Sequence, residues 1–409
     1  MHRNVSHRPP LRSSPVNPVL SRIGPWVGLA TSPVALVAGG GVAEGLSGAE
    51  LVIAVVVGAA LLATLSGAQG VVGQREGRPL APITARVLGT AGSRYVGSVV
   101  MLAMMLGWFG VNAGIAGAAT GRLVGLPDTL GIALFAAALL AIALLGLRML
   151  SWAGLTAGVA ATALAAYGMY LVLDGREVTL SGGFTGAEPM PLAAGITLMV
   201  GYGSAFSLRT PDFTHDLPRT RHVVWCALWG LCVPLIAFAL AGALLYAATG
   251  DWDLGDALRD LGSSQLAYLF VAVGFVGSVL TNIWSGGLAL RDVVPRLGAR
   301  TAMAAVTLVG AAAAAAGSAD RALDWLTLMA LAAPGLVVLC VIARPGSDEP
   351  ARGWRFVPLI AWGTGIVCAI GLQYAGLTVA LPAAAAVPAA AYWLLGRLPE
   401  RHRDTPSRR

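Results

Sequence analysis

Long apolar stretches separated by short polar segments run along almost the whole chain. A transmembrane helix needs about 20 mostly apolar residues, and twelve stretches come close to or exceed that length. The pattern therefore predicts an all-α integral membrane protein with twelve transmembrane helices. The predicted spans are 24–43, 49–72, 94–120, 129–147, 151–173, 190–208, 223–249, 265–290, 299–317, 322–343, 355–375 and 377–396.

The composition agrees with this pattern and removes several functional classes. Hydrophobic residues make up 56% of the 409 positions and charged residues only 11%, whereas a soluble domain carries about a quarter charged residues. A soluble enzyme, a nucleic-acid-binding protein and a disordered protein are therefore excluded. The four cysteines have no metal-type spacing, and no nucleophile or acid–base set is visible. We expect a protein that is not an enzyme and has no cofactor, apart from a bound Na⁺ as coupling ion.

The positions of the charges predict the orientation in the membrane. All 27 basic residues are arginines, and 23 of them lie in the two tails and in alternate loops, against four in the remaining loops. Loops rich in Lys and Arg stay in the cytoplasm, which places both termini there, in a bacterial-type inner membrane. The net charge of +7 thus records topology, and we expect membrane lipid around the protein, with no nucleic-acid partner and no obligate protein partner.

The apolar spans contain no convincing Asp, Glu or His. Such groups mark proton relays and ion paths when they occur inside a membrane, so their absence favours a neutral solute. Ion coupling stays open, because backbone carbonyls and hydroxyls can bind Na⁺.

The lengths of the segments indicate an internal repeat. Five spans lie in 24–173 and five in 190–343, blocks of nearly equal length, followed by two extra spans in 355–396. Inverted repeats of this kind are common in transporters, where interrupted helices form the binding site. We expect a five-plus-five inverted repeat (LeuT-like) with two added C-terminal helices, between cytoplasmic tails 1–23 and 397–409.

The first span of each block carries residues that interrupt a helix. Span 1 contains Pro33, which cannot donate a backbone hydrogen bond, and span 6 contains Tyr202 between Gly201 and Gly203, where glycine permits unwinding. Irregular backbone at membrane depth is tolerated where it lines a cavity or is packed in protein. The alternative is that the small residues only allow close helix packing.

Two spans carry polar or aromatic residues suited to recognition. Trp108 and Asn112 are four apart in span 3 and share a helix face, so the indole can stack on a flat ring while the amide reads its polar edge. The alternatives are packing for the indole and an interhelical hydrogen bond for the amide. In span 8 a polar stripe faces either a cavity or a neighbouring helix: Ser278, Thr281, Asn282 and Ser285.

With these residues the sequence resembles the nucleobase:cation symporter family, the purine/cytosine permeases. Four motifs occur in the family's order: Gly45-Leu46-Ser47, Gly107-Trp108-Phe109-Gly110, Pro211-Asp212-Phe213-Thr214 and Asn282-Ile283-Trp284-Ser285-Gly286-Gly287. The resemblance implies the five-plus-five fold with two extra helices. It also implies uptake of uracil, cytosine, purines, allantoin, hydantoins or the pyrimidine precursor of thiamine, together with Na⁺ or H⁺.

The resemblance also implies roles for individual residues. Trp108 would stack on the ring, and Asn112 would hydrogen-bond to it. The candidate substrate-binding set is Ser32, Trp108, Asn112, Tyr202, Gly203, Phe206 and Asn282, and the candidate Na⁺ site is Gly28, Thr31, Ser278 and Thr281. The chain departs from the family at Gly203, where cytosine carriers have an aromatic residue, so Tyr202 or Phe206 would supply the second ring face. It also has Gly277-Ser278 where the family often has two hydroxyl residues, and His215 where it usually has Arg.

The leading hypothesis is a secondary active transporter that imports a small neutral nucleobase-like heterocycle (cytosine, a purine or a related pyrimidine) by alternating access. A carrier of hydroxymethylpyrimidine, allantoin or a hydantoin is the alternative within the family; Phe206 looks closer to the hydroxymethylpyrimidine carriers. A non-transporting, receptor-like membrane paralogue is the alternative from another class, and the thinned Na⁺ site is its only support.

Overall fold

The structure is a computed structural model that describes residues 17–176, 178, 189–318, 322–343, 353–375 and 377–395, without the side chains of 322–330. Every regular element among these residues is a helix, which confirms the all-α class. The predicted tails lie outside the described residues, apart from residues 17–23.

The helices of the first half are α1 (Gly24–Ala30), α2 (Pro33–Gly45), α3 (Gly48–Glu76), α4 (Leu80–Gly92), the π-helix η1 (Ser93–Gly97), α5 (Ser98–Val124), α6 (Asp128–Leu144) and α7 (Leu147–Leu173). Those of the second half and the C-terminal region are α8 (Leu192–Arg209), α9 (Pro211–Thr214), α10 (Thr220–Trp225), the π-helix η2 (Cys226–Cys232), α11 (Val233–Thr249), α12 (Leu254–Asp260), α13 (Ser264–Gly274), α14 (Val276–Val293), α15 (Ala299–Ala315), α16 (Ala322–Ile342), α17 (Phe356–Tyr374) and α18 (Ala380–Leu395).

A helix or a run of helices lies at each of the twelve predicted spans. Six helical stretches among the described residues are long and apolar enough to cross a membrane, or seven if the bent pair α1–α2 is one span. Others are shorter apolar helices, such as α6 and α15. A multi-pass membrane protein follows from this, while the count of twelve spans stays a prediction.

The predicted interruption of span 1 is confirmed. α1 ends at Ala30, α2 begins at Pro33, and the two helices are bent by 41°. Because Pro33 has no N–H, the carbonyl of Leu29 four residues earlier loses its helical partner. That carbonyl instead accepts hydrogen bonds from the backbone N–H of Ser32 at 3.2 Å and from the hydroxyl of Tyr202. The break is therefore held by a side chain from the second half of the chain.

The predicted interruption of span 6 is wrong, because α8 is an unbroken helix from Leu192 to Arg209. Glycine permits unwinding but does not remove a hydrogen-bond donor as proline does. Here the lack of a side chain serves packing: a Cβ on Gly203 would lie 2.5 Å from the Leu62 side chain of α3. The alternative of close helix packing holds at this position.

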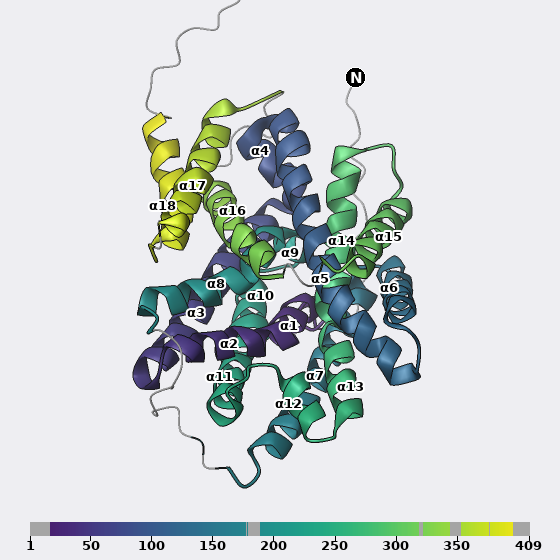
Figure 1. The fold of residues 1–409 in the computed structure, drawn as a ribbon. Coiled ribbons are helices and arrows are strands. Elements are labelled where there is room, and N and C mark those ends of the chain that lie inside the picture. Colours follow the sequence, from purple (N-terminus) through teal and green to yellow (C-terminus); the bar gives the residue numbers. More distant parts are fainter. Residues whose placement is uncertain are drawn as a thin grey trace, which may run out of the picture.

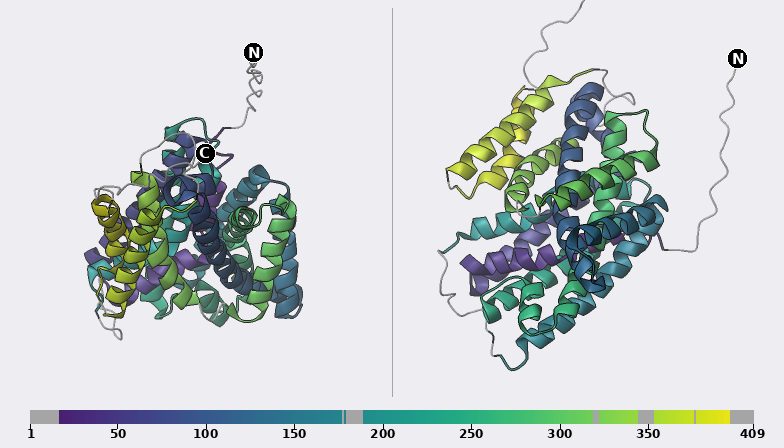
Figure 2. Two further views of the ribbon diagram at one scale, coloured as in Figure 1. Left: turned by 90° about the horizontal axis from the view of Figure 1, so that it is seen from above. Right: turned by 45° about the vertical axis from the view of Figure 1, so that its right-hand side comes forward.

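The helices of the two predicted halves interleave rather than forming separate bodies. α3 packs along α8, α2 along α11, and α14 along α5. Figure 1 shows α5 passing through the middle of the helical body with α14 beside it. At one edge α17 and α18 lie side by side against α16, an arrangement that both views in Figure 2 retain. The break between α1 and α2 thus lies deep among helices of both halves.

Near that break the backbones of α1 and α14 come into close contact. A Cβ on Gly28 would lie 2.6 Å from the Cα of Gly277, and a Cβ on Gly277 would lie 2.4 Å from the Cα of Gly28. Real Cβ contacts are not this short, so both positions require glycine. The contact fixes α14, with its polar stripe, directly against the interrupted helix.

Candidate functional site

A cavity of about 20 Å³ lies where the α1–α2 break meets α5, α8 and α14. Its wall contains all seven residues of the predicted substrate-binding set, brought together from four separate parts of the chain. The lining residues are Leu29, Ser32, Val34, Trp108, Asn112, Tyr202, Gly203, Ala205, Phe206, Arg209, Ser278 and Asn282. We call this space the central cavity. The convergence of these residues is observed, and their role in binding stays a prediction.

The α5 side of the central cavity carries one aromatic and one amide side chain. Trp108 is partly buried, whereas Asn112 is only 3% exposed. The Asn112 Nδ2 donates to the Ser278 hydroxyl over 3.3 Å, which joins α5 to α14. The Asn112 Oδ1 is buried without a hydrogen-bond partner among the described residues. One atom of the amide therefore makes the interhelical hydrogen bond of the alternative interpretation, and the role of the other atom in binding stays a prediction.

The α8 side supplies two aromatic side chains with different surroundings. The Tyr202 hydroxyl lies 2.9 Å from the Ser32 Oγ and also donates to the Leu29 carbonyl, so it is tied to the break. Phe206 packs edge-on against Trp26 at 5.2 Å between ring centroids and stacks on Phe213 at 5.9 Å. Both rings are held rigidly by the protein, and both line the central cavity.

The sequence interpretation missed Arg209, which is 4% exposed and lines the central cavity. Counting spans by length ended span 6 at residue 208 and assigned this arginine to a cytoplasmic loop. In the structure its guanidinium donates to the Asn282 Oδ1 at 2.8 Å and to the Thr281 Oγ1 at 3.0 Å, and lies 5.4 Å from the centre of the Phe206 ring. Helical spacing could have predicted that Arg209 faces the site, because residues 202, 206 and 209 share one face of a helix.

This finding corrects the premise that no charge lies within the spans. A second buried charged residue, the acid Asp212, is 3% exposed, and its Oδ1 accepts a hydrogen bond from the backbone N–H of Leu80 at 2.9 Å. That bond caps the start of α4, which agrees with a structural role for the loop motif. Away from their ends the predicted spans still contain no Asp, Glu or His, so the neutral solute stays a prediction, and the buried charge of Arg209 weighs against it.

The four candidate Na⁺ ligands lie close together but make other contacts. The Thr31 hydroxyl donates to the Val27 carbonyl at 2.9 Å, and that of Ser278 donates to the Phe275 carbonyl at 3.0 Å. The Thr281 hydroxyl donates to the Ser278 carbonyl and accepts from the Arg209 guanidinium. Gly28 is pressed against the α14 backbone as described above. A cation bound through Thr281 would thus have a guanidinium as its neighbour.

A second, larger cavity of about 230 Å³ lies on the side of the predicted cytoplasmic loops. α4, α5 and α14 form much of its wall, and its charged and polar lining residues include Asp212, Ser285, Arg291 and Asp292. One helical turn of α14 separates Ser285, in this wall, from Asn282 in the wall of the central cavity. We call this space the lower cavity.

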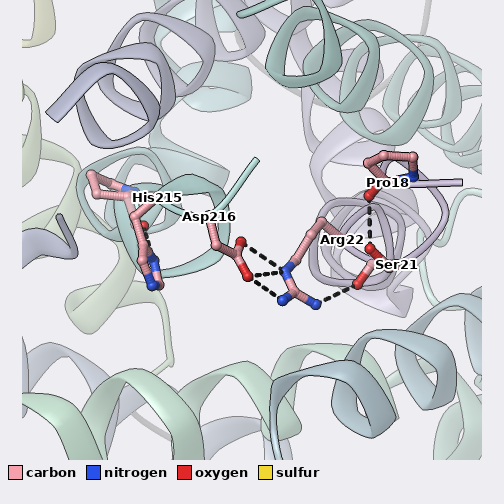
Figure 3. A network of polar contacts seen from close by, with 6 residues as sticks. Pro18, Ser21, Arg22, His215 and Asp216 are labelled. Atoms are coloured by element: carbon pink, nitrogen blue, oxygen red, sulfur yellow. Dashed lines mark hydrogen bonds and ion pairs between the residues drawn. The ribbon is translucent and has the colours of Figure 1, made fainter. Parts of the chain in front are cut away.

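An ion pair on the same predicted side joins the residues before α1 to the loop after α9. The Arg22 Nε lies 3.0 Å from the Asp216 Oδ1, and the Arg22 Nη2 contacts the Oδ2 more closely. Figure 3 shows the guanidinium facing this carboxylate, with the His215 ring turned instead to the Pro211 carbonyl at 3.0 Å. Burial alone would raise the pKa of Asp216, but the hydrogen bond and charge of Arg22 outweigh it and hold the pKa below its usual range.

The chain was compared first with protein families and with curated protein sequences. The model of a family described as permease for cytosine/purines, uracil, thiamine and allantoin matches residues 23–343. No curated protein sequence matches the chain.

Among solved structures, Mhp1, a nucleobase-cation-symport-1 family transporter in a closed conformation with bromovinylhydantoin bound, has a TM-score of 0.78 and 18% identity and covers 92% of each chain. A Na⁺-coupled sialic acid symporter in a substrate-bound outward-open state has a TM-score of 0.64 and 12% identity, over 93% of this chain and 89% of that one. An Eremococcus coleocola manganese transporter mutant has a TM-score of 0.55 and 15% identity, over 92% and 93%. At these identities the likeness is one of fold.

Proposed function

Because the chain belongs to the family of permeases for cytosine/purines, uracil, thiamine and allantoin, it is a membrane transporter and not an enzyme, and we propose that it imports a nucleobase-like heterocycle. One observation carries this proposal. The central cavity gathers an aromatic ring from α5, two from α8 and one amide each from α5 and α14. Flat rings stack on aromatic faces, and amides read the polar edge of a ring through both a donor and an acceptor.

In the proposed complex, Trp108 covers one face of the heterocycle, and Phe206 or Tyr202 covers the other. Phe206 is the better candidate of the two, because the Tyr202 hydroxyl already holds the α1–α2 break through Leu29 and Ser32. Asn112 and Asn282 each have one amide atom without a partner among the described residues, and in the proposed complex these atoms bind the ring edge.

We propose alternating access as the transport cycle, with the five-helix repeats 24–173 and 190–343 moving about the central cavity. A cavity of about 20 Å³ has room for about one water molecule, so a heterocycle needs the surrounding helices to separate. The lower cavity lies between this site and the predicted cytoplasmic loops, and we propose it as the start of the inward release path.

The coupling cation is either Na⁺ or H⁺ in this proposal. Na⁺ is supported by the fold shared with the Na⁺-coupled sialic acid symporter and by the grouping of Gly28, Thr31 and Ser278. The contact between Thr281 and Arg209 weighs against it, because two cations at adjacent positions repel.

Both termini lie in the cytoplasm, and the membrane is a bacterial inner membrane.

Uptake of radiolabelled compounds into cells that lack their own carriers tests the proposal. The panel contains cytosine, uracil, hypoxanthine, allantoin and hydroxymethylpyrimidine, and each is offered with Na⁺ and with choline in its place. We expect saturable uptake of at least one member. No uptake of any member, from protein shown to be in the membrane, would refute import of these uncharged heterocycles. Uptake that ignores Na⁺ but stops with a protonophore would assign H⁺ as the coupling ion.

A further inference from the structure

A buried positive charge at the central cavity has no direct counter-charge among the described residues. The guanidinium of Arg209 contacts an amide oxygen of Asn282, a hydroxyl of Thr281, the Met105 sulfur and the face of Phe206. All four are neutral groups. Transfer of an ion from water into a protein interior is costly unless an opposite charge offsets it.

The nearest buried acid, Asp212, attracts Arg209 through space, but no hydrogen bond or ion pair joins the two among the described residues. The ion pairs formed by the described residues do not include Arg209. The Asp212 carboxylate receives the backbone N–H of Leu80 and lines the lower cavity, whereas Arg209 lines the central cavity. The two charges therefore face different spaces.

Three buried polar atoms around the central cavity lack hydrogen-bond partners among the described residues. They are the Arg209 Nε, the Asn282 Nδ2 and the Asn112 Oδ1, on side chains that are 4%, 1% and 3% exposed. Buried polar groups are nearly always hydrogen-bonded, so each such atom calls for an explanation. Two of them are donors and one is an acceptor.

This pattern has a complementary ligand. The two donors call for a ring oxygen, and the acceptor on α5 calls for a ring N–H. An oxygen that carries negative charge satisfies the donors best, because hydrogen bonds between charged partners are about twice as strong as those between neutral ones. The same oxygen offsets the buried charge of Arg209.

We propose that the central site takes a nucleobase-like heterocycle that is anionic at neutral pH, with its charged oxo edge toward Arg209 and Asn282 and an N–H toward Asn112. This inference rests on the proposed function and sharpens its substrate class. Arg209 is the residue that determines specificity for charge. A neutral ring of the same shape makes the same stacking contacts but leaves the guanidinium uncompensated.

Equilibrium binding to the purified full chain tests the inference with two matched pairs of ligands. Barbiturate and uracil are six-membered oxo-pyrimidines, and urate and hypoxanthine are oxo-purines; in each pair only the first is an anion at neutral pH. We expect the anion of at least one pair to bind about tenfold tighter than its neutral partner. Lowering the pH until the anion is protonated should remove the preference.

Substitutions test whether the preference for anionic ligands depends on Arg209. Arg209→Gln should abolish it while Arg209→Lys keeps part of it. Arg122→Gln, at an arginine 48% exposed and paired with Asp128, should leave it unchanged as the matched control. The comparison on the unmodified protein needs no variant and stands even if Arg209→Gln fails to fold.

The outcomes separate this inference from the function on which it rests. Neutral rings that bind as tightly as their anionic partners, or more tightly, would overturn the inference and leave the proposed function standing. A preference for anions that survives in folded Arg209→Gln would also overturn it. Failure of both pairs to bind, together with no uptake of the panel above, would refute the proposed function itself.

Discussion

Replacing Tyr202 by phenylalanine removes one oxygen atom from the point where the two halves of the chain hold the α1–α2 break. The Tyr202 hydroxyl donates a hydrogen bond to the Leu29 carbonyl, whose helical partner is missing because of Pro33. The same hydroxyl lies 2.9 Å from the Ser32 Oγ. A buried hydrogen bond contributes about 1 kcal/mol net, and an acceptor left unsatisfied costs about 1–3 kcal/mol. The Leu29 carbonyl keeps one hydrogen bond, from the Ser32 N–H at 3.2 Å.

The expected loss for Tyr202→Phe is therefore about 1–3 kcal/mol in the free energy of unfolding. Denaturant unfolding in detergent micelles, followed by tryptophan fluorescence, measures it against the wild type. Tyr167→Phe makes the same chemical change at a side chain that is 55% exposed on α7, and there we expect a change within about 0.5 kcal/mol. Equal stability of Tyr202→Phe and this control would show that the hydroxyl does not hold the break.

Three further substitutions test other contacts. Gly28→Ala places a methyl group 2.6 Å from the backbone of α14 and should lower the free energy of unfolding by about 1–3 kcal/mol. The control is Gly41→Ala, whose added Cβ would have its nearest neighbour at 3.5 Å, and it should not lower the free energy of unfolding. Equal effects of the two substitutions would contradict the close contact. Asp253→Ala removes the side chain that caps α12 at 2.7 Å and should cost about 0.5–2 kcal/mol in the same assay; no loss would argue against the cap. The Arg22 ion pair lowers the pKa of Asp216, so its stabilisation is present above the usual carboxyl pKa and is lost as the pH falls through the lowered one. Arg22→Ala should remove that acid-side loss from melting curves taken across the acid range, because burial then acts on the pKa of Asp216 without the opposing charge of Arg22. An unchanged acid profile would contradict the coupling.

The interruption of span 1 could be predicted because proline acts through a missing atom. Pro33 removes a donor from any helix that contains it, whatever surrounds it. Gly201 and Gly203 remove nothing from the backbone, so their effect depends on neighbours that the sequence does not reveal. In α8 those neighbours include the Leu62 side chain of α3, which needs the space beside Gly203, and the helix stays intact.

The burial of Arg209 could not be predicted by counting apolar residues. A span measured that way ends at the first charge, so an arginine at the end of an apolar stretch is assigned to the loop. Its burial depends on Met105 and Thr281, which lie 104 and 72 positions away in the chain. By contrast, Trp108, Asn112 and Asn282 were found from the sequence because aromatic and amide side chains within an apolar span stand out without knowledge of the fold.

In the proposed function, a heterocycle is recognised in the central cavity by stacking on Trp108. Uptake of the panel compound that the wild type transports best, measured in cells that express Trp108→Ala, tests it most directly, with membrane levels of the two proteins compared by immunoblot. We expect uptake to fall to background while the protein still reaches the membrane. Uptake at the wild-type rate and affinity would contradict it.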